Sequence, residues 1–197
     1  MHSRALQTLL LCLPICALAQ GTFTYDQQSA DETNLGGGVW DVQSNQPMGQ
    51  SFTPTLPSIG FIRLYLSDGA FNGLGTTFHV HLLTGSITGV VISSTSPLTV
   101  QDGFHGPLDF VFSTPVAVSP GSTYYFQPIV QSGESFGVYA YNTFNYAAGT
   151  AFAFGADQGP FDLWFREGII VPEPSSLALA LSGLACFAVV IRRRRSC

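Results

Sequence analysis

The chain contains no lysine, and none of its four cysteines lies between residues 20 and 171. Without thiols, segment 20–171 has no disulfides, no cysteine catalysis and no zinc–thiolate site. A domain of about 150 residues still buries roughly 68–70% of its unfolded surface. We therefore expect this segment to be one domain that is stabilised by its core alone.

Positive charge is also scarce in this segment. Arg63 and Arg166 are its two basic residues and stand against eleven acidic ones, a formal charge of −9, whereas the whole chain carries −5. An acidic surface repels phosphate backbones, which excludes a nucleic-acid-binding function. Cations, neutral sugars or solubility in a crowded matrix are compatible with it. We expect Arg166 to pair with one of the acids.

Segment 20–171 shows no helical period. Its apolar residues alternate in steps of two, and turn residues separate the alternating runs. This pattern predicts an all-β fold, an antiparallel β-sandwich of about eight to ten strands that is jelly-roll-like. The expected strands lie within 59–69, 76–85, 90–100, 108–112, 124–130, 136–146, 149–154 and 161–167.

Turn residues suggest how some of these strands connect. Asn72-Gly73 favours a hairpin between the strands on either side, and Ser119–Ser122 favours a compact turn. The stretch VAVSPGSTYYFQP, residues 116–128, resembles a segment of exported jelly-roll domains, including carbohydrate-binding modules, in which a hairpin places a Tyr-Tyr-Phe strand in the sheet. After a first strand at 22–25, we expect the rest of 22–50 to be a long loop.

The N-terminal residues have the layout of a secretory signal peptide. Arg4 precedes a largely apolar run at 9–18 and the small-residue site Ala17-Leu18-Ala19, which predicts a signal peptide at 1–19 that is cleaved before Gln20. The alternative is a lipoprotein at Cys16, but bulky residues precede that cysteine. The export machinery is therefore an expected partner.

The C-terminal residues 172–197 have three parts in a fixed order. Pro172-Glu173-Pro174 is followed by an uncharged run at 175–191 and by Arg192, Arg193, Arg194 and Arg195. The run has the minimum length for a transmembrane helix. The arginines orient it with its C-terminal end in the cytoplasm.

This tail resembles the PEP-CTERM protein-sorting signal of bacteria, although the resemblance does not extend to the preceding domain. It implies recognition by an exosortase-type protease-transpeptidase in the membrane. The tail would anchor the protein transiently in the inner membrane, be removed near the motif, and deliver domain 20–171 to the cell surface or an exopolysaccharide matrix. The alternative is a plain anchor that stays in place.

Catalytic motifs are lacking in the domain. It has no G-x-S-x-G nucleophile motif, and nothing in the spacing of its acids points to the carboxylate pair of a polysaccharide hydrolase. We expect a non-catalytic structural or interaction role, with no cofactor. The alternative is a carbohydrate-binding module.

Aromatic residues carry that alternative. Tyr139 and Tyr141 share one face of a strand, while the small Val138 and Ala140 share the other. With polar neighbours, exposed aromatics would stack on sugar rings; the other reading is that they fill the core. The remaining candidates are Tyr146, Trp164, Trp40 and Phe144.

Metal ligands form two candidate sets. His79 and His81 share one strand face and would bind a metal if a carboxylate joined them, although we favour a simple solvent-facing pair. The irregular N-terminal part contains carboxylates that would suit a structural calcium ion. They are Asp26, Asp31, Glu32 and Asp41.

Overall fold

The alternating segments build two antiparallel sheets that face each other across one core. The computed structural model describes residues 21–172, apart from residues 30, 31, 34, 36, 71 and 145, and these form strands and loops without a helix. Within this part of the chain, no helix has the length and apolar character needed to cross a membrane. The expected signal peptide at 1–19 and the run at 175–191 lie outside the described residues.

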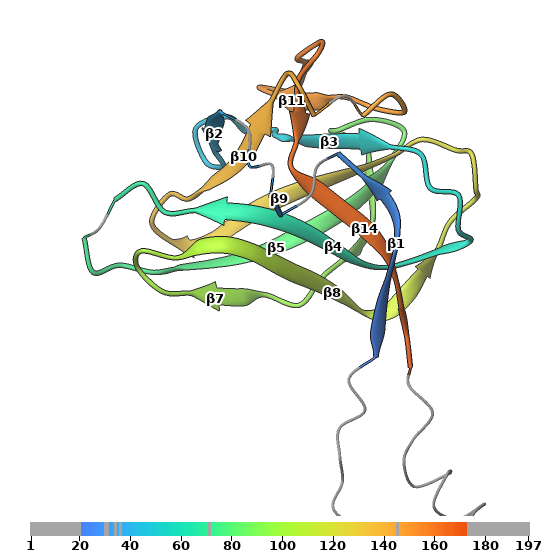
Figure 1. Ribbon diagram of the computed structural model, residues 1–197, viewed down its shortest axis with the longest axis horizontal. Helices are drawn as coiled ribbons and strands as arrows, with labels where there is room; N and C mark the ends of the chain where they lie inside the picture. Colours follow the sequence, from blue (N-terminus) through green and yellow to red (C-terminus); the bar gives the residue numbers. More distant parts are fainter. Residues whose placement is uncertain are drawn as a thin grey trace, which may run out of the picture. The chain divides into compact units, whose positions relative to one another are not determined.

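Sheet A contains seven strands, and its strands β4 and β14 lie in front of sheet B in Figure 1. Its order is β1-β14-β4-β10-β13; β8 pairs with the free side of β4, and β2 pairs with β10. Their bounds are β1 Thr22–Gln28, β2 Gly38–Asp41, β4 Ser58–Ser67, β8 His105–Ala117, β10 Gly137–Tyr141, β13 Asp162–Leu163 and β14 Phe165–Val171.

Sheet B also contains seven strands, in the order β12-β11-β3-β9-β5-β6, with β7 beside β5. The long pairing of β5 with β9 forms its centre. Their bounds are β3 Gly49–Phe52, β5 Thr76–Thr84, β6 Val90–Ser94, β7 Leu98–Val100, β9 Tyr124–Gly133, β11 Ala151–Ala153 and β12 Ala156–Asp157.

The core lies between the sheets, where the alternation predicts it. Leu64 and Leu66 of β4 face Phe78 and Val80 of β5 in one buried cluster. Phe165 of β14 meets the ring of Phe126 in β9 at a centroid distance of 5.3 Å. The prediction of an antiparallel β-sandwich is confirmed, but the described residues form fourteen strands instead of about eight to ten. Two predicted runs, 90–100 and 161–167, are each divided into two strands, and β2, β3 and β12 form where no strand was predicted.

Strand β3 lies in the segment for which a loop was predicted. Its sequence Gly-Gln-Ser-Phe is fully buried, but it does not alternate between apolar and polar residues. Gln50 satisfies its amide by donating to Asp162 (2.8 Å) and accepting from the Leu163 amide N–H (2.9 Å). A side chain at Gly49 would lie 2.0 Å from the Phe126 carbonyl oxygen. β3 is therefore held by the close approach of its backbone to β9 and by the hydrogen bonds of Gln50, and it lacks the alternating apolar residues by which a strand is recognised in a sequence.

Two connections differ from the predictions. Asn72-Gly73 joins β4 of sheet A to β5 of sheet B, so the predicted hairpin is wrong. Ser119–Ser122 forms a compact turn, in which the Ser122 N–H donates to the Ser119 carbonyl at 3.1 Å, but β8 and β9 also belong to different sheets. Turn residues mark where a strand ends and do not reveal which sheet the next strand joins.

Candidate functional site

The outer face of sheet A carries a group of aromatic side chains, which we call the aromatic cluster: Tyr65, Tyr139, Tyr141, Phe144 and Trp164. The ring of Tyr65 lies 5.2 Å from Tyr139 and 5.5 Å from Trp164, measured between centroids. His105, at the start of β8, adds a ring 5.3 Å from Tyr65. These side chains meet because β4 pairs with β8 on one side and with β10 on the other.

The rings of this cluster meet edge to face. Tyr65 makes an angle of 83° with Tyr139 and 71° with Trp164. Aromatic rings favour this arrangement, but it does not form one flat platform. Trp164 is 0% exposed, whereas Tyr65, Tyr139 and Tyr141 are partly exposed. Stacking against a sugar would therefore depend on the tyrosines.

Two of the candidate aromatics lie outside the cluster. Tyr146 packs edge-on against Phe165 at 5.2 Å, and its hydroxyl donates to Gln27 at 3.0 Å. Burial raises the pKa of this phenol to about 12. Trp40 packs against Phe161 at 5.4 Å. The rings of Tyr146 and Trp40 both pack against other aromatic rings of the domain.

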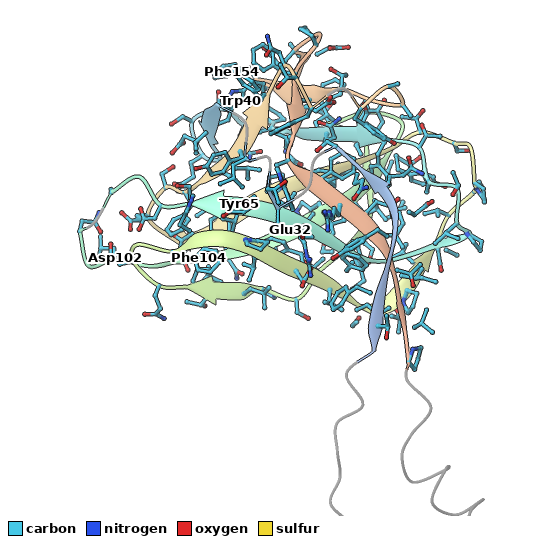
Figure 2. All side chains as sticks on the ribbon, in the orientation of Figure 1. Glu32, Trp40, Tyr65, Asp102, Phe104 and Phe154 are labelled. Carbon is cyan, nitrogen blue, oxygen red and sulfur yellow. The ribbon has the colours of Figure 1, made fainter. Side chains whose placement is uncertain are left out.

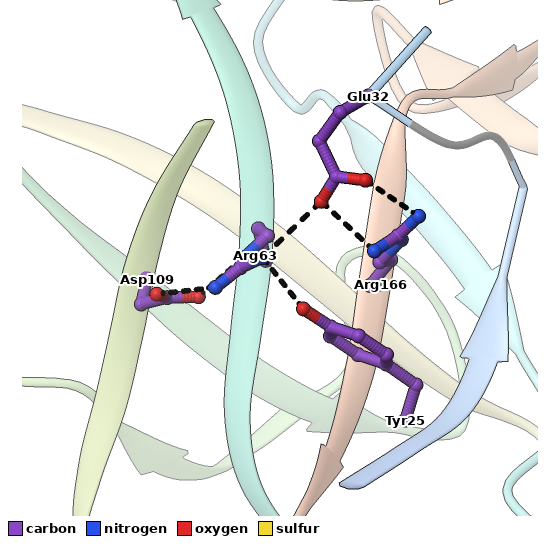
Figure 3. A network of polar contacts seen from close by, with 5 residues as sticks. All are labelled: Tyr25, Glu32, Arg63, Asp109 and Arg166. Atoms are coloured by element: carbon purple, nitrogen blue, oxygen red, sulfur yellow. Dashed lines mark hydrogen bonds and ion pairs between the residues drawn. The ribbon is translucent and has the colours of Figure 1, made fainter. Parts of the chain in front are cut away.

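A polar network lies beside the aromatic cluster on the same side of sheet A (Figures 2 and 3). Both arginines of the domain reach Glu32: Arg63 at 3.2 Å and Arg166 at 2.8 Å. Arg63 also binds both Asp109 oxygens, at 2.6 and 2.8 Å, and donates to the Tyr25 hydroxyl at 2.6 Å. The hydrogen bonds to Asp109 raise the pKa of Arg63 above its ordinary value. The prediction that Arg166 pairs with an acid is confirmed.

This network holds the loop around Glu32 against the sheet. The Arg166 guanidinium lies 4.6 Å from the centre of the Tyr25 ring and 5.7 Å from that of Trp164. Glu32 is exposed, so each ion pair contributes only about 0–1 kcal/mol. The contacts support a structural role, since they fix a covering loop over β14.

Two of the buried carboxyl groups among the described residues, Glu167 and Asp162, have pKa values that burial raises. Glu167 is 0% exposed; burial, followed by the nearby Asp26 carboxylate, raises its pKa to about 9, so it is protonated at neutral pH. Burial also raises the pKa of Asp162, which accepts hydrogen bonds from Gln50 and from the Tyr146 amide. Asp162 and Tyr146 line a pocket of about 260 Å³. Glu167 does not line it.

Three other carboxylates gather where strands of both sheets end. Ligand oxygens of Asp68, Asp102 and Glu134 all lie within 4.8 Å of one another, so this trio is a group of three acids among the described residues that could hold a metal ion. Asp68 also accepts hydrogen bonds from the N–H groups of Ala70 and Gly103, at 2.8 and 2.7 Å. Oxygen ligands of this kind suit Ca²⁺.

The carboxylates predicted to bind calcium have separate partners. Asp26 accepts hydrogen bonds from the Thr55 and Leu56 N–H groups, at 2.7 and 2.9 Å. Burial opposes ionisation of Asp26, but these hydrogen bonds outweigh it and lower the pKa. Glu32 binds the arginines, and Asp31 lies outside the described residues. The structure thus gathers a different set of acids from the predicted one.

Asp41, the fourth of these acids, lines the larger pocket of about 390 Å³. It accepts hydrogen bonds from the Ser44 N–H at 2.6 Å and from the Ser135 hydroxyl. Ser135 lines the same pocket.

The trio Asp68, Asp102 and Glu134 left a partial signal in the sequence, because each of these acids is next to a glycine, a residue that marks strand ends. Whether the three carboxylates come together depends on which sheets those strands join, and the sequence does not show this.

The histidines share one face of β5, as the alternation predicts, and this strand belongs to sheet B. The rings of His79 and His81 are neighbours on one face of β5, with their centroids 4.6 Å apart. They are remote from the aromatic cluster, which belongs to sheet A.

The sorting residues follow directly on the last strand. β14 ends at Val171, and Pro172 is the last described residue. Glu173, Pro174 and the arginines Arg192–Arg195 lie outside the described part of the chain.

Comparison with known proteins identifies the tail. No curated protein and no solved structure matches the chain. Residues 171–195 match the PEP-CTERM protein-sorting motif, which contains the Pro-Glu-Pro sequence, the uncharged run and the arginines. The chain therefore carries a PEP-CTERM sorting signal. Such a signal implies processing by exosortase, a membrane enzyme, and export to the cell envelope or surface.

Proposed function

We propose that the β-sandwich, residues 23–171, is the part that functions at the surface, as a non-catalytic module with a structural or interaction role in the extracellular polysaccharide layer. The observation that carries this proposal is the position of the sorting motif. β14 ends at Val171 and lies between β1 and β4. Because Pro172-Glu173-Pro174 follows the fourteen strands of the described residues, cleavage there leaves both sheets whole.

The contacts of the ionisable side chains support a structural role. Asp26 caps the loop at Thr55 and Leu56. Asp109 binds Arg63 across two neighbouring strands of sheet A. Such groups stabilise the sandwich, whereas a glycosidase needs two carboxyl groups that face its substrate in a groove.

The proposed route adds the two terminal segments. Residues 1–19 act as the signal peptide, and 175–191 anchor the protein transiently in the inner membrane until exosortase acts. We further propose that the sandwich is a jelly roll. Its main strands follow the neighbour orders β1-β14-β4-β8 and β3-β9-β5-β6, so that the chain alternates between the sheets except from β5 to β6, which are neighbours in sheet B.

Localisation in cells tests the route. Replacing Pro172-Glu173-Pro174 by alanines should leave the full chain in the membrane fraction, because exosortase no longer recognises the tail. Replacing Ser175 and Ser176 by alanines is the matched control and should leave surface delivery unchanged. Normal surface delivery of the first variant would contradict the proposed route.

Carbohydrate binding is the second candidate function, which the partly exposed rings of Tyr65, Tyr139 and Tyr141 favour. If sugars stack there, Tyr139→Ala and Tyr141→Ala should each weaken binding on a polysaccharide array by about tenfold, since aromatic contacts contribute about 0.5–1.5 kcal/mol beyond the area they bury. Tyr125→Ala, on sheet B, is the matched control. Absence of binding at millimolar sugar would remove this candidate and leave the structural role standing.

A further inference from the structure

Two imidazoles on the outer face of sheet B have no part in the proposed function. His79 and His81 are two residues apart on β5, and their Nε2 atoms lie 3.4 Å from each other. Nδ1 of His81 lies 2.7 Å from the Ser94 hydroxyl of β6. Nδ1 of His79 is buried. The Nε2 atoms are thus the ring nitrogens that lie next to each other.

This spacing fits a single metal ion. Zinc binds histidine nitrogen at about 2.0–2.1 Å in tetrahedral sites, so two such ligands are about 3.3 Å apart. The observed 3.4 Å between the two Nε2 atoms meets this requirement without moving the strand. Nδ1–H of His81 can donate to Ser94, which orients that ring and leaves its Nε2 free to ligate.

We propose that His79 and His81 form a binding site for a borderline transition-metal ion such as Zn²⁺, Ni²⁺ or Cu²⁺, with water at the remaining positions. Imidazole suits these ions. The residues paired with His79 and His81 on neighbouring strands are Ile129, Gln127 and Ser94, all uncharged. None of these paired positions offers a carboxylate to a hard cation such as Ca²⁺, whereas the trio Asp68, Asp102 and Glu134 does.

Protons compete weakly with a metal at this site. Burial lowers the pKa of both imidazoles, and the second ring lowers that of His79 further. Both rings are therefore neutral at pH 7, the form that binds metal. With two protein ligands and the other positions open, the site is exchangeable and weaker than a closed structural zinc site.

Metal titration of the full chain tests the proposal. Zn²⁺ binding is measured by calorimetry for the wild type and for His79→Gln, His81→Gln and His105→Gln. Each of the first two variants should lose about tenfold or more in affinity at one site per chain, while His105→Gln should match the wild type. The four cysteines of the chain are common to all variants, so the differences isolate the histidine pair.

A spectroscopic measurement keeps the test valid if a variant folds poorly. Cu²⁺ bound to the wild-type chain with its cysteines blocked should show electron paramagnetic coupling to two imidazole nitrogens, and each single variant should lose one. Equal zinc affinity in the wild type, His79→Gln and His81→Gln would overturn the proposal. So would a copper spectrum without two coupled nitrogens.

Discussion

The two sheets of the sandwich differ sharply in charge. Strands of sheet A contain Asp26, Asp41, Arg63, Asp109, Asp162, Arg166 and Glu167, whereas Asp157 is the single acidic or basic residue in the strands of sheet B. The outer face of sheet A combines ion pairs with half-buried aromatics. That of sheet B presents neutral groups such as His79, His81 and Gln127. The strands of sheet A carry a net formal charge of −3 and those of sheet B −1, so most of the −9 of the domain lies outside the strands. The difference teaches that the charged strand residues, acids and arginines together, gather on one sheet, so the two faces suit different ligands.

The sheets nevertheless share one core, and its disruption should have the largest effect. Phe165 of sheet A contacts Phe52 and Phe126 of sheet B. Phe165→Ala should lower the free energy of unfolding by about 3–5 kcal/mol, because it leaves a cavity. Phe154 is 67% exposed, so Phe154→Ala should cost less than about 0.5 kcal/mol. Chemical denaturation compares them; equal losses would contradict a core shared by the two sheets.

The buried carboxyl of sheet A should make stability depend on pH. The pKa of Glu167 rises from 4.5 to about 9 on folding, so the folded state keeps a proton that the unfolded state releases. Its stabilising contribution is complete below pH 4.5 and is lost as pH rises through about 9, at about 1 kcal/mol per pH unit.

Denaturation at several pH values checks this. Between pH 7 and 9 the free energy of unfolding should fall by about 2 kcal/mol in the wild type and stay level in Glu167→Gln, which has no proton to lose. Sheet B has no comparable group in its strands. Parallel pH profiles for the two proteins would show that Glu167 ionises normally in the fold.

Gln50 links the sheets by hydrogen bonds rather than by packing. It lies in β3 of sheet B and binds Asp162 and Leu163 of sheet A. Gln50→Leu should cost about 1–3 kcal/mol of unfolding free energy, because it leaves buried polar groups unpaired. Gln131→Leu, at an exposed position of β9, is the matched control and should change stability by about 0.5 kcal/mol or less. If Gln50→Leu left the free energy of unfolding unchanged, the proposed link between the sheets would be contradicted.

The ion pairs of sheet A should have the smallest effect. Glu32→Gln weakens the contacts to Arg63 and Arg166 and should cost at most about 1 kcal/mol. The loss should shrink in 1 M salt, which screens exposed charges. Asp157→Asn on sheet B keeps its acceptor oxygen and should show no salt-dependent loss. A loss at Glu32 that persists in high salt would point to a role other than charge pairing.

The sequence was sufficient to predict the fold class, the core faces and the sorting tail. Alternation put Val138 and Ala140 on one face of their strand and Tyr139 and Tyr141 on the other, without deciding which face is buried, and it placed His79 beside His81. These predictions rest on local periodicity, which the backbone of a strand enforces. The arginine cluster and Pro-Glu-Pro are contiguous motifs and need no tertiary information.

Features that depend on chain crossing were not predicted. Trp164 was one candidate for a binding surface, and the structure buries it against the tyrosines of β4 and β10. β3 was missed because glycine and hydrogen-bonded glutamine replace apolar residues there. The trio Asp68, Asp102 and Glu134 comes from loops far apart in the sequence. In each case the position of the residues depends on which sheet a strand joins, and the local sequence does not show this.

Mass spectrometry of the protein recovered from the cell surface tests the central claim most directly. We expect peptides that cover the sandwich as far as β14 and none from Leu177 onward, because exosortase removes the tail near Pro172. Recovery of surface protein that retains the intact Arg192–Arg195 end would contradict processing and identify the tail as a permanent anchor.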